Sequence, residues 1–350
     1  MHFASDNTAP AHPEVIEAIA RANEGYPHSY GADPIMDDVR AKVRDLFEAP
    51  DAAVYLVATG TAANALILAT LVQPWQAVFC HRAAHIETDE CGAPEFYTGG
   101  SKLVLIDGEH AKMTPEGLQR ALSTTGQVGV HGVQRGMLSL TNATENGTIY
   151  RPSEVAELAA IAHADGLPVH MDGARFANAV VAAGCSPAEM TWKAGVDALS
   201  FGGTKNGLMG VEGAVFFDPK TAWEFELRRK RGGHLISKHR YLSAQMAAYL
   251  NDDLWREMAS AANARAKRLS DGIAQIKGAS LIHPTQANGV FASWPRAGHR
   301  RAHEAGAEYY FWPSDQSLDG PDDESLPARL MCSWSTTNAD VDRFLDLIRG

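Results

Sequence analysis

Short apolar runs alternate with segments of helical periodicity from residue 53 to residue 217. This alternation is typical of strands joined by crossover helices, because a parallel strand is reached by a connection across the face of the sheet. It predicts an α/β fold with a mostly parallel seven-stranded sheet. The expected strands are Ala53–Ala58, Ala77–Cys80, Leu103–Ile106, Met137–Thr141, Pro168–Met171, Ala198–Phe201 and Ala214–Phe217.

Four segments have the apolar spacing expected of helices. Two precede the sheet, one beginning at Pro13 and one over Ile35–Phe47, and a stretch rich in turn residues at 25–31 separates them. Two more, Thr61–Leu71 and Ser153–Ala164, lie between predicted strands. These positions fit a sheet with helices packed on its faces.

The pattern changes near residue 241, where an alanine-rich stretch from about Leu242 to Ile276 predicts one long helix. We therefore expect a large domain over residues 1–241 and a smaller C-terminal α+β domain over residues 242–350. The further elements expected in the small domain are strands near Gly289–Ser293 and Leu330–Trp334 and a helix capped at Asn338.

Charge and composition narrow the range of partners. The 31 Lys and Arg against 42 Asp and Glu give a net charge of −11, which repels nucleic acid and anionic membranes. No apolar run approaches the ~18 residues that span a bilayer, and no basic residue precedes Arg21, so no signal peptide is expected. The four cysteines form no Cys-x-x-Cys pair, which argues against a zinc ribbon and against a disulfide scaffold. We expect a cytoplasmic protein that acts on a small molecule, with no nucleic-acid or membrane partner.

The segment Ala58–Asn64 lies between a predicted strand and a predicted helix. Gly60 lets the backbone approach a ligand, and the Thr61 hydroxyl stands beside the unpaired N–H groups of a helix N-terminus. These features indicate a phosphate-binding turn, although a plain turn with a threonine N-cap explains them equally well. No Walker A or Gly-x-Gly-x-x-Gly pattern is present, so neither a nucleoside triphosphate nor a dinucleotide is implied. The missing dinucleotide pattern also argues against a reductase.

Two further segments place reactive groups after predicted strands. Asp172 and Arg175 follow one strand at its carboxyl end, where parallel sheets bind ligands, and an arginine suits a carboxylate. Lys205 follows another strand across a glycine-rich turn, where an amine shielded from water can attack aldehydes. Separately each has a simpler explanation, since Asp172 could cap a helix and most lysines are surface residues.

Together the three segments supply the groups that pyridoxal phosphate requires. The coenzyme needs a lysine for a Schiff base, an anion at its pyridinium nitrogen and an anchor for its phosphate. Lys205, Asp172 and the turn at Gly60 meet these needs in that order. The sequence therefore predicts a pyridoxal phosphate enzyme.

The chain resembles the low-specificity L-threonine aldolases, which share the aspartate-aminotransferase-like fold of fold type I pyridoxal phosphate enzymes. The resemblance runs nearly end to end and is most specific in His-Met-Asp-Gly-Ala-Arg at 170–175 and Thr-Lys-Asn-Gly at 204–207. It implies cleavage of L-threonine, L-allo-threonine or a related L-β-hydroxy-α-amino acid to glycine and an aldehyde. The Thr-Lys-Asn-Gly motif lies in the matching segment Ser200–Gly207, and the other matching segments are Ser5–Asn7, Ser29–Gly31, Ala58–Asn64, His81–Gly92 and Arg329–Leu330.

The resemblance also assigns roles to residues. It implies that Lys205 forms the Schiff base, that Asp172 pairs with the pyridine nitrogen and that His85 stacks on the ring. The implied coenzyme ligands are Gly60, Thr61, His85, Asp172, Arg175, Lys205, Lys238 and Arg240. The implied substrate ligands are Ser5, Tyr30, Arg175 and Arg329.

Cleavage needs a base for the proton of the substrate hydroxyl. His85 is the first candidate and His131 the second, because a neutral imidazole accepts a proton near neutral pH. Glu90 could take part. His81 and His85 have a helical i,i+4 spacing, but no His-Glu-x-x-His pattern is present, so no metal site is expected.

Other readings use the same groups. A transaminase or a β-eliminating lyase needs the same coenzyme contacts, and a non-catalytic protein could keep the fold. The Ser5–Asn7 opening and the paired histidines favour the aldolase. The resemblance further implies a homo-oligomer, dimer or tetramer, in which Tyr30 and either Lys238 or Arg240 reach the neighbouring site. The preferred substrate stays open.

Overall fold

The computed structural model describes all 350 residues and contains two β-sheets. The larger sheet has seven strands in the order β1-β7-β6-β5-β4-β2-β3. β7 runs antiparallel to both of its neighbours, and the other neighbouring strands are parallel. The strands are β1 Ala53–Val57, β2 Gln76–His81, β3 Lys102–Ile106, β4 Gln134–Thr141, β5 Val169–Gly173, β6 Ala198–Gly202 and β7 Glu212–Phe216. The predicted mostly parallel seven-stranded sheet is confirmed.

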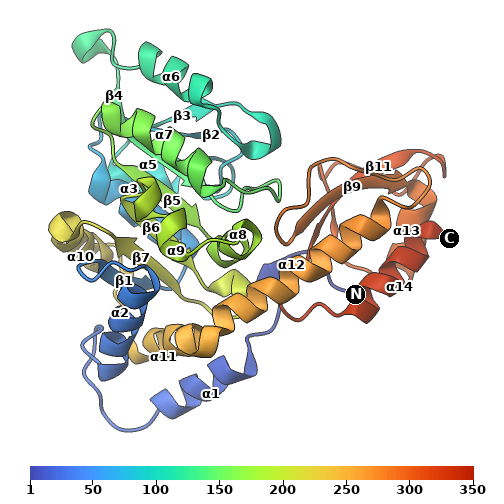
Figure 1. Cartoon of the computed structure of the whole chain (residues 1–350), viewed down its shortest axis with the longest axis horizontal. Coiled ribbons are helices and arrows are strands. Elements are labelled where there is room, and N and C mark those ends of the chain that lie inside the picture. The colour runs from blue at the N-terminus through green and yellow to red at the C-terminus, as the bar shows by residue number, and fades with distance from the viewer.

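Helices pack on this sheet because most connections between its strands cross its faces (Figure 1). The helix at Gly60–Leu71, α3, has apolar residues on all sides and is almost entirely buried, as expected for a helix inside the core. The predicted helix at 153–164 is also present. The remaining helices that precede or join these strands are α1 Pro13–Ala22, α2 Pro34–Leu46, α4 His85–Thr88, α5 Ala93–Thr98, α6 Pro115–Thr124, α7 Pro152–Ala164, α8 Phe176–Ala183 and α9 Pro187–Met190.

The second sheet has four strands in the order β10-β11-β9-β8, and its neighbours are antiparallel. Both chain ends lie beside it (Figure 1), and Phe3 packs in its hydrophobic core with Trp294 and Phe344. The expected boundary at residue 241 stays a prediction. The elements after the first sheet are α10 Ala222–Arg231, α11 Arg240–Leu250, α12 Leu254–Ile273, β8 Ser280–Leu281, β9 Gly289–Pro295, α13 Arg296–Glu304, β10 Tyr310–Phe311, β11 Ser325–Met331 and α14 Asn338–Arg349.

The expectation of one long helix over 242–276 is wrong. Asp252 and Asp253 have φ angles of 47° and 58°, in the left-handed region, and they end α11 before α12 begins. Aspartate tolerates this conformation because its short side chain can bond to the local backbone. Thr337, rather than Asn338, caps the last helix by accepting a hydrogen bond from the Asp340 amide.

The fold determines where the reactive residues meet. In the large sheet β4, β5 and β6 are parallel, so their carboxyl ends share one edge, and the N-terminus of α3 lies beside it. Ligands bind outside this edge in open α/β sheets. No helix is long and apolar enough to span a membrane.

Candidate active site

A cavity opens at the carboxyl ends of β5 and β6, beside the N-terminus of α3. It brings together residues from six separate segments of the chain, which the sequence places up to 205 positions apart. Most of the lining side chains are polar or charged. The lining residues are Asn7, Ala58, Thr59, Gly60, Thr61, Asn64, His85, Glu90, Asp172, Ala174, Thr204, Lys205 and Glu212.

The N-terminus of α3 forms one wall. Thr59, not Thr61, is the N-cap, because its hydroxyl oxygen accepts a hydrogen bond from the Ala62 amide at 3.1 Å. The amides of Gly60 and Thr61 therefore stay free of partners within the helix. A Cβ atom at Gly60 would meet no atom within 4 Å, so the backbone is open on this side. Such a helix end favours an anion.

Asp172 lies at the end of β5 and is 2% exposed. Its Oδ1 accepts a hydrogen bond from the Ala174 amide at 3.0 Å, and its Oδ2 accepts one from Asn64 Nδ2 at 3.0 Å. These two donors hold a buried carboxylate in one orientation. It can therefore serve as a fixed anion.

Lys205 lies in the short turn after β6 and donates no hydrogen bond within the chain. Its neighbour Asn206 fixes the turn, since Nδ2 donates to the Tyr249 hydroxyl and to the Trp255 carbonyl, both at 2.8 Å. Gly207 follows with φ 92°, and a Cβ there would lie 2.4 Å from Met258 Sδ. The turn is therefore rigid while its lysine amine is free.

Glu212, the first residue of β7, is buried beside this turn. Burial raises the pKa of Glu212 to about 7. Two groups oppose this rise: the Gly203 amide, which donates to Glu212 Oε2 at 2.8 Å, and the positive charge of Lys205. A carboxyl group that titrates near neutral pH therefore lies beside the lysine turn.

His85 and Glu90 form a pair on the other side of the cavity. His85 Nδ1 lies 2.9 Å from Glu90 Oε1, and this hydrogen bond raises the pKa of His85 against the effect of burial. Burial raises the pKa of Glu90. His85 thus has Nδ1 engaged with Glu90, while Nε2 lies 3.6 Å from Asp89 Oδ2, beyond hydrogen-bond distance, and can exchange a proton.

Two arginines lie near the cavity, and they differ in whether the guanidinium group is already bonded to a carboxylate. Arg175 is buried and donates to Asp6 from Nε and Nη2, which leaves both hydrogens of Nη1 and one of Nη2 for a ligand. Arg329, in β11, is partly buried and donates no hydrogen bond within the chain. Its guanidinium lies 5.6 Å from the centre of the Trp312 ring. A free cation of this kind can bind a carboxylate.

Within one subunit the structure does not bring His131 to this site, and its assignment as a base stays a prediction. His131 is exposed and precedes β4 at the amino end of that strand. Asp172 pairs with Thr141 at the carboxyl end. Seven strand steps of about 3.3 Å separate the two ends by about 23 Å.

Other predicted residues lie outside the cavity lining. Ser5 caps a short turn, accepting from the Asn7 amide at 3.2 Å. Tyr30 is 45% exposed, with Lys230 Nζ 4.5 Å from its ring centre. Lys238 is exposed, and Arg240 donates to the carbonyl of Gly25 at 3.1 Å. Their roles stay predictions.

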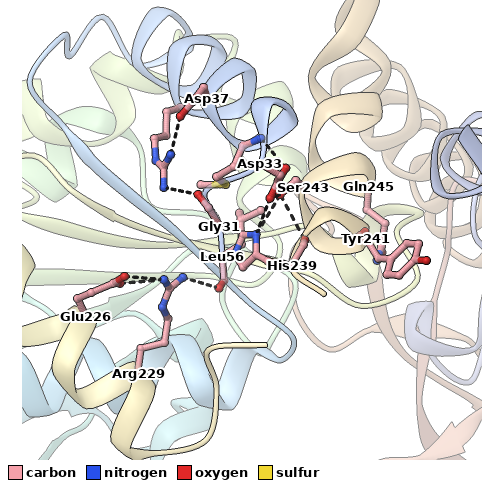
Figure 2. A network of polar contacts seen from close by, with 12 residues as sticks. Gly31, Asp33, Asp37, Leu56, Glu226, Arg229, His239, Tyr241, Ser243 and Gln245 are labelled. Atoms are coloured by element: carbon pink, nitrogen blue, oxygen red, sulfur yellow. Dashed lines mark hydrogen bonds and ion pairs between the residues drawn. The ribbon is translucent and has the colours of Figure 1, made fainter. Parts of the chain in front are cut away.

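The basic segment 228–240 is anchored at both ends (Figure 2). Arg229 is 2% exposed, and it donates to the Leu56 carbonyl and pairs with Glu226. His239 lies beside Ser243 and Asp33, and burial lowers the pKa of His239 to about 4. These anchors leave the residues between them at the surface.

Several site residues were not predicted from the sequence. Asp6 and Asn64 stand inside segments that were singled out, but nothing in their spacing distinguishes them. Glu212 lies between Gly210 and Gly213, just before the expected strand Ala214–Phe217, and nothing in the sequence marks it as buried. Glu145, in the loop after β4, lies beside Arg175 in a small adjoining cavity and raises the pKa of His85 through its charge.

Comparisons with known proteins agree with this geometry. The family model for beta-eliminating lyases matches residues 2–294. A curated low specificity L-threonine aldolase from Pseudomonas aeruginosa is 42% identical over 347 residues, which are 99% of this chain and 96% of that protein. The solved threonine aldolase of Leishmania major has a TM-score of 0.90 at 25% identity, covering 99% of this chain and 98% of that one. Serine palmitoyltransferase of Sphingomonas wittichii shares the fold, with a TM-score of 0.72 at 15% identity over 100% of this chain and 86% of that one.

The fold and the site define a fold type I pyridoxal phosphate protein, and the chain belongs to the beta-eliminating lyase family. Within that family its near full-length similarity places it with the low specificity L-threonine aldolases.

Proposed function

We propose that this protein cleaves L-threonine and related L-β-hydroxy-α-amino acids to glycine and an aldehyde, with pyridoxal phosphate as coenzyme. The observation that carries the proposal is the meeting of four groups in one cavity. These are a free lysine amine, a buried carboxylate, a helix N-terminus and an imidazole paired with a carboxylate.

The residues present fit the coenzyme. The free amides of Gly60 and Thr61 suit its phosphate, since that helix end is open and favours anions. Asp172, fixed by two donors, would face the ring nitrogen, and Lys205 would hold the aldehyde carbon covalently. Bound pyridoxal phosphate supplies an electron-accepting ring for the pair left when the Cα–Cβ bond breaks.

Arg329 is the group best suited to the substrate carboxylate. Its guanidinium contacts the Trp312 ring but has no hydrogen-bond or ion-pair partner, whereas Arg175 is already engaged by Asp6. Fixing the carboxylate orients the amino acid, and orientation decides which bond at Cα is weakened. Arg175 would contribute its Nη1 and hold the N-terminal segment in place.

His85 would move the proton of the substrate hydroxyl. When Glu90 is ionised it accepts the Nδ1 hydrogen of His85, which leaves Nε2 as the acceptor. After the aldehyde has left, the protonated imidazole can give this proton to Cα, which completes glycine. Glu90 orients the imidazole and stabilises its charged form.

Product analysis tests the function. Purified protein with pyridoxal phosphate and L-threonine should yield acetaldehyde and glycine in equal amounts, followed with an aldehyde-specific reagent. L-allo-threonine and a bulkier aryl analogue assayed in parallel would rank the substrates. Ammonia with a keto acid, in place of aldehyde, would contradict the proposal and indicate β-elimination.

We also propose that the protein is a cytoplasmic homo-oligomer, a dimer or tetramer, with active sites shared between subunits. Exposed aromatic side chains support this, since Tyr26 is fully exposed and Tyr30 is 45% exposed on one loop. All four cysteines are free, as the reducing cytoplasm keeps them. Light scattering with and without a Tyr30→Ala substitution would measure the assembly and its effect on activity.

A further inference from the structure

Asn64 bridges two buried acids. The residue lies in α3 and is 2% exposed, and its amide nitrogen donates to Glu90 Oε1 at 2.8 Å and to Asp172 Oδ2 at 3.0 Å. The two acids are 4% and 2% exposed. An amide nitrogen has two hydrogens, so each acid receives one.

The bridge has only one possible orientation. Two ionised carboxylates only accept hydrogen bonds, so Nδ2 of Asn64 must face them and Oδ1 must face Ser200, whose hydroxyl donates at 2.6 Å. Ser200 has then used its hydrogen and accepts from His170 Nε2 at 3.1 Å. The remaining His170 nitrogen, Nδ1, accepts from the Ser139 hydroxyl at 3.0 Å.

His170 is therefore a neutral imidazole with its hydrogen on Nε2. Burial lowers the pKa of His170 to about 4, which agrees with the neutral form. This histidine belongs to the His-Met-Asp-Gly-Ala-Arg segment but does not line the cavity. His170 has a structural role, because its hydrogen bond to Ser200 fixes the Asn64 amide, which in turn holds Asp172.

Glu90 depends on this bridge for its charge. Its Oε1 accepts from both Asn64 and His85, while its Oε2 is buried without any partner. A second carboxylate, Asp172, lies across the same amide, and like charges at short range favour protonation of one. Loss of one of two donors would therefore favour the protonated form of Glu90.

We propose that Asn64 is a positioning residue that keeps Asp172 and Glu90 ionised together. One amide thereby joins the anion for the coenzyme ring to the pair that moves the substrate proton. If Glu90 gained a proton, its hydroxyl would donate to His85 Nδ1 and leave Nε2 carrying the hydrogen, so His85 could not act as a base. The catalytic consequence of this inference rests on the proposed function. The effect of Asn64 on the charge of Glu90 does not depend on that function.

Other charged groups act on the same pair and must be held constant. They are Asp89, which follows α4, Glu145 in the loop after β4, His170 within β5 and Lys205 in the turn after β6. None of them is changed in the variants below. A change in pH dependence would then come from the Asn64 bridge.

The first test measures urea unfolding of the full chain without coenzyme at pH 5 and pH 8. Asn64→Leu keeps the size of the side chain but removes both donors. Because its Glu90 must ionise without a donor as the pH rises, its urea midpoint should fall further below wild type at pH 8 than at pH 5. The control is Asn178→Leu, which removes a buried amide bonded to Asn263 away from the cavity and should show the same deficit at both pH values.

A rescue completes the test. Glu90→Gln removes the second charge, so the Asn64→Leu substitution in that background should lose its extra deficit at pH 8. Equal deficits for Asn64→Leu at both pH values would overturn the proposal. This result is independent of whether the protein cleaves threonine.

The second test uses the loaded enzyme. The acid limb of kcat/KM should move upward by about one to two pH units in Asn64→Leu, the shift expected on loss of a hydrogen bond to a charged group. An unmoved limb with reduced kcat would contradict the proposal. Absence of aldolase activity in the wild-type protein would reject the proposed function while leaving the unfolding test decisive for Asn64.

Discussion

Arg175 is bonded at two points to Asp6, with Nε 2.7 Å from Oδ2 and Nη2 2.9 Å from Oδ1. The two residues lie 169 positions apart and both are buried. Asn288 also donates to Asp6 Oδ2, at 3.0 Å. The N-terminal segment is thereby tied to the end of β5, which places Asn7 in the cavity lining.

The substitution Asp6→Ala should destabilise the protein by about 3–5 kcal/mol, because it leaves the Arg175 guanidinium buried without a counter-charge. Burial raises the pKa of Asp6, but the charge and hydrogen bonds of Arg175 outweigh it and lower the pKa to about 2. The stabilisation is thus complete above the unfolded pKa of about 3.9 and lost as the pH falls toward 2.

Urea unfolding at several pH values checks this. The difference between wild type and Asp6→Ala should stay constant from pH 7 to about pH 4 and shrink as the pH falls further toward 2. Asp37→Ala is the control, since its carboxylate pairs with Arg40 at the surface and should contribute about 1 kcal/mol or less. If the stability difference between wild type and Asp6→Ala did not change with pH, the carboxylate charge of Asp6 would not be the source of the stabilisation.

The two arginines should respond differently to substitution. Arg329→Leu should raise KM by roughly 10- to 100-fold with little change in stability, because a charged hydrogen bond to substrate is lost and no partner in the chain is orphaned. Arg175→Leu should lower stability as well, since it leaves Asp6 buried and unpaired. Steady-state kinetics and thermal unfolding measured together separate these effects, and equal destabilisation by both would contradict the assignment.

His85 should govern proton transfer. His85→Asn should keep bound coenzyme but lower kcat by about 10²- to 10⁴-fold. The hydrogen bond that His85 donates to Glu90 raises the pKa of His85, so wild-type activity should decline as the pH falls through a value above 6.5. Full activity with coenzyme still bound would remove His85 from this role.

His131 provides a contrasting case. Because it is exposed at the far edge of the sheet, His131→Ala should change kcat and KM by less than twofold. The same assay used for His85 measures this. A loss comparable to that of His85→Asn would require a partner subunit to bring His131 to the site.

The local sequence predicts those features that depend on neighbouring residues. All seven strands of the large sheet were expected, because each is a short apolar run bounded by turn residues. Asp172 is predicted because it directly follows such a run, and Lys205 because it follows one across a short glycine-rich turn. The break at Asp252 and Asp253 was missed, since alanine-rich flanks favour helix and only the observed φ angles show the interruption.

Long-range pairings had no sequence signal. Asp6 meets Arg175, and Asn64 meets Glu90 and Asp172, only after the sheet has formed, so spacing along the chain carries no trace of them. The sequence likewise does not show that His131 precedes β4, at the opposite end of that strand from Asp172.

Covalent labelling of Lys205 tests the account most directly. Protein incubated with pyridoxal phosphate is reduced with sodium borohydride, digested and mapped by mass spectrometry. We predict one modified lysine, at position 205, with activity lost in proportion to labelling. Modification at another lysine, or full activity of a Lys205→Ala variant, would contradict the account.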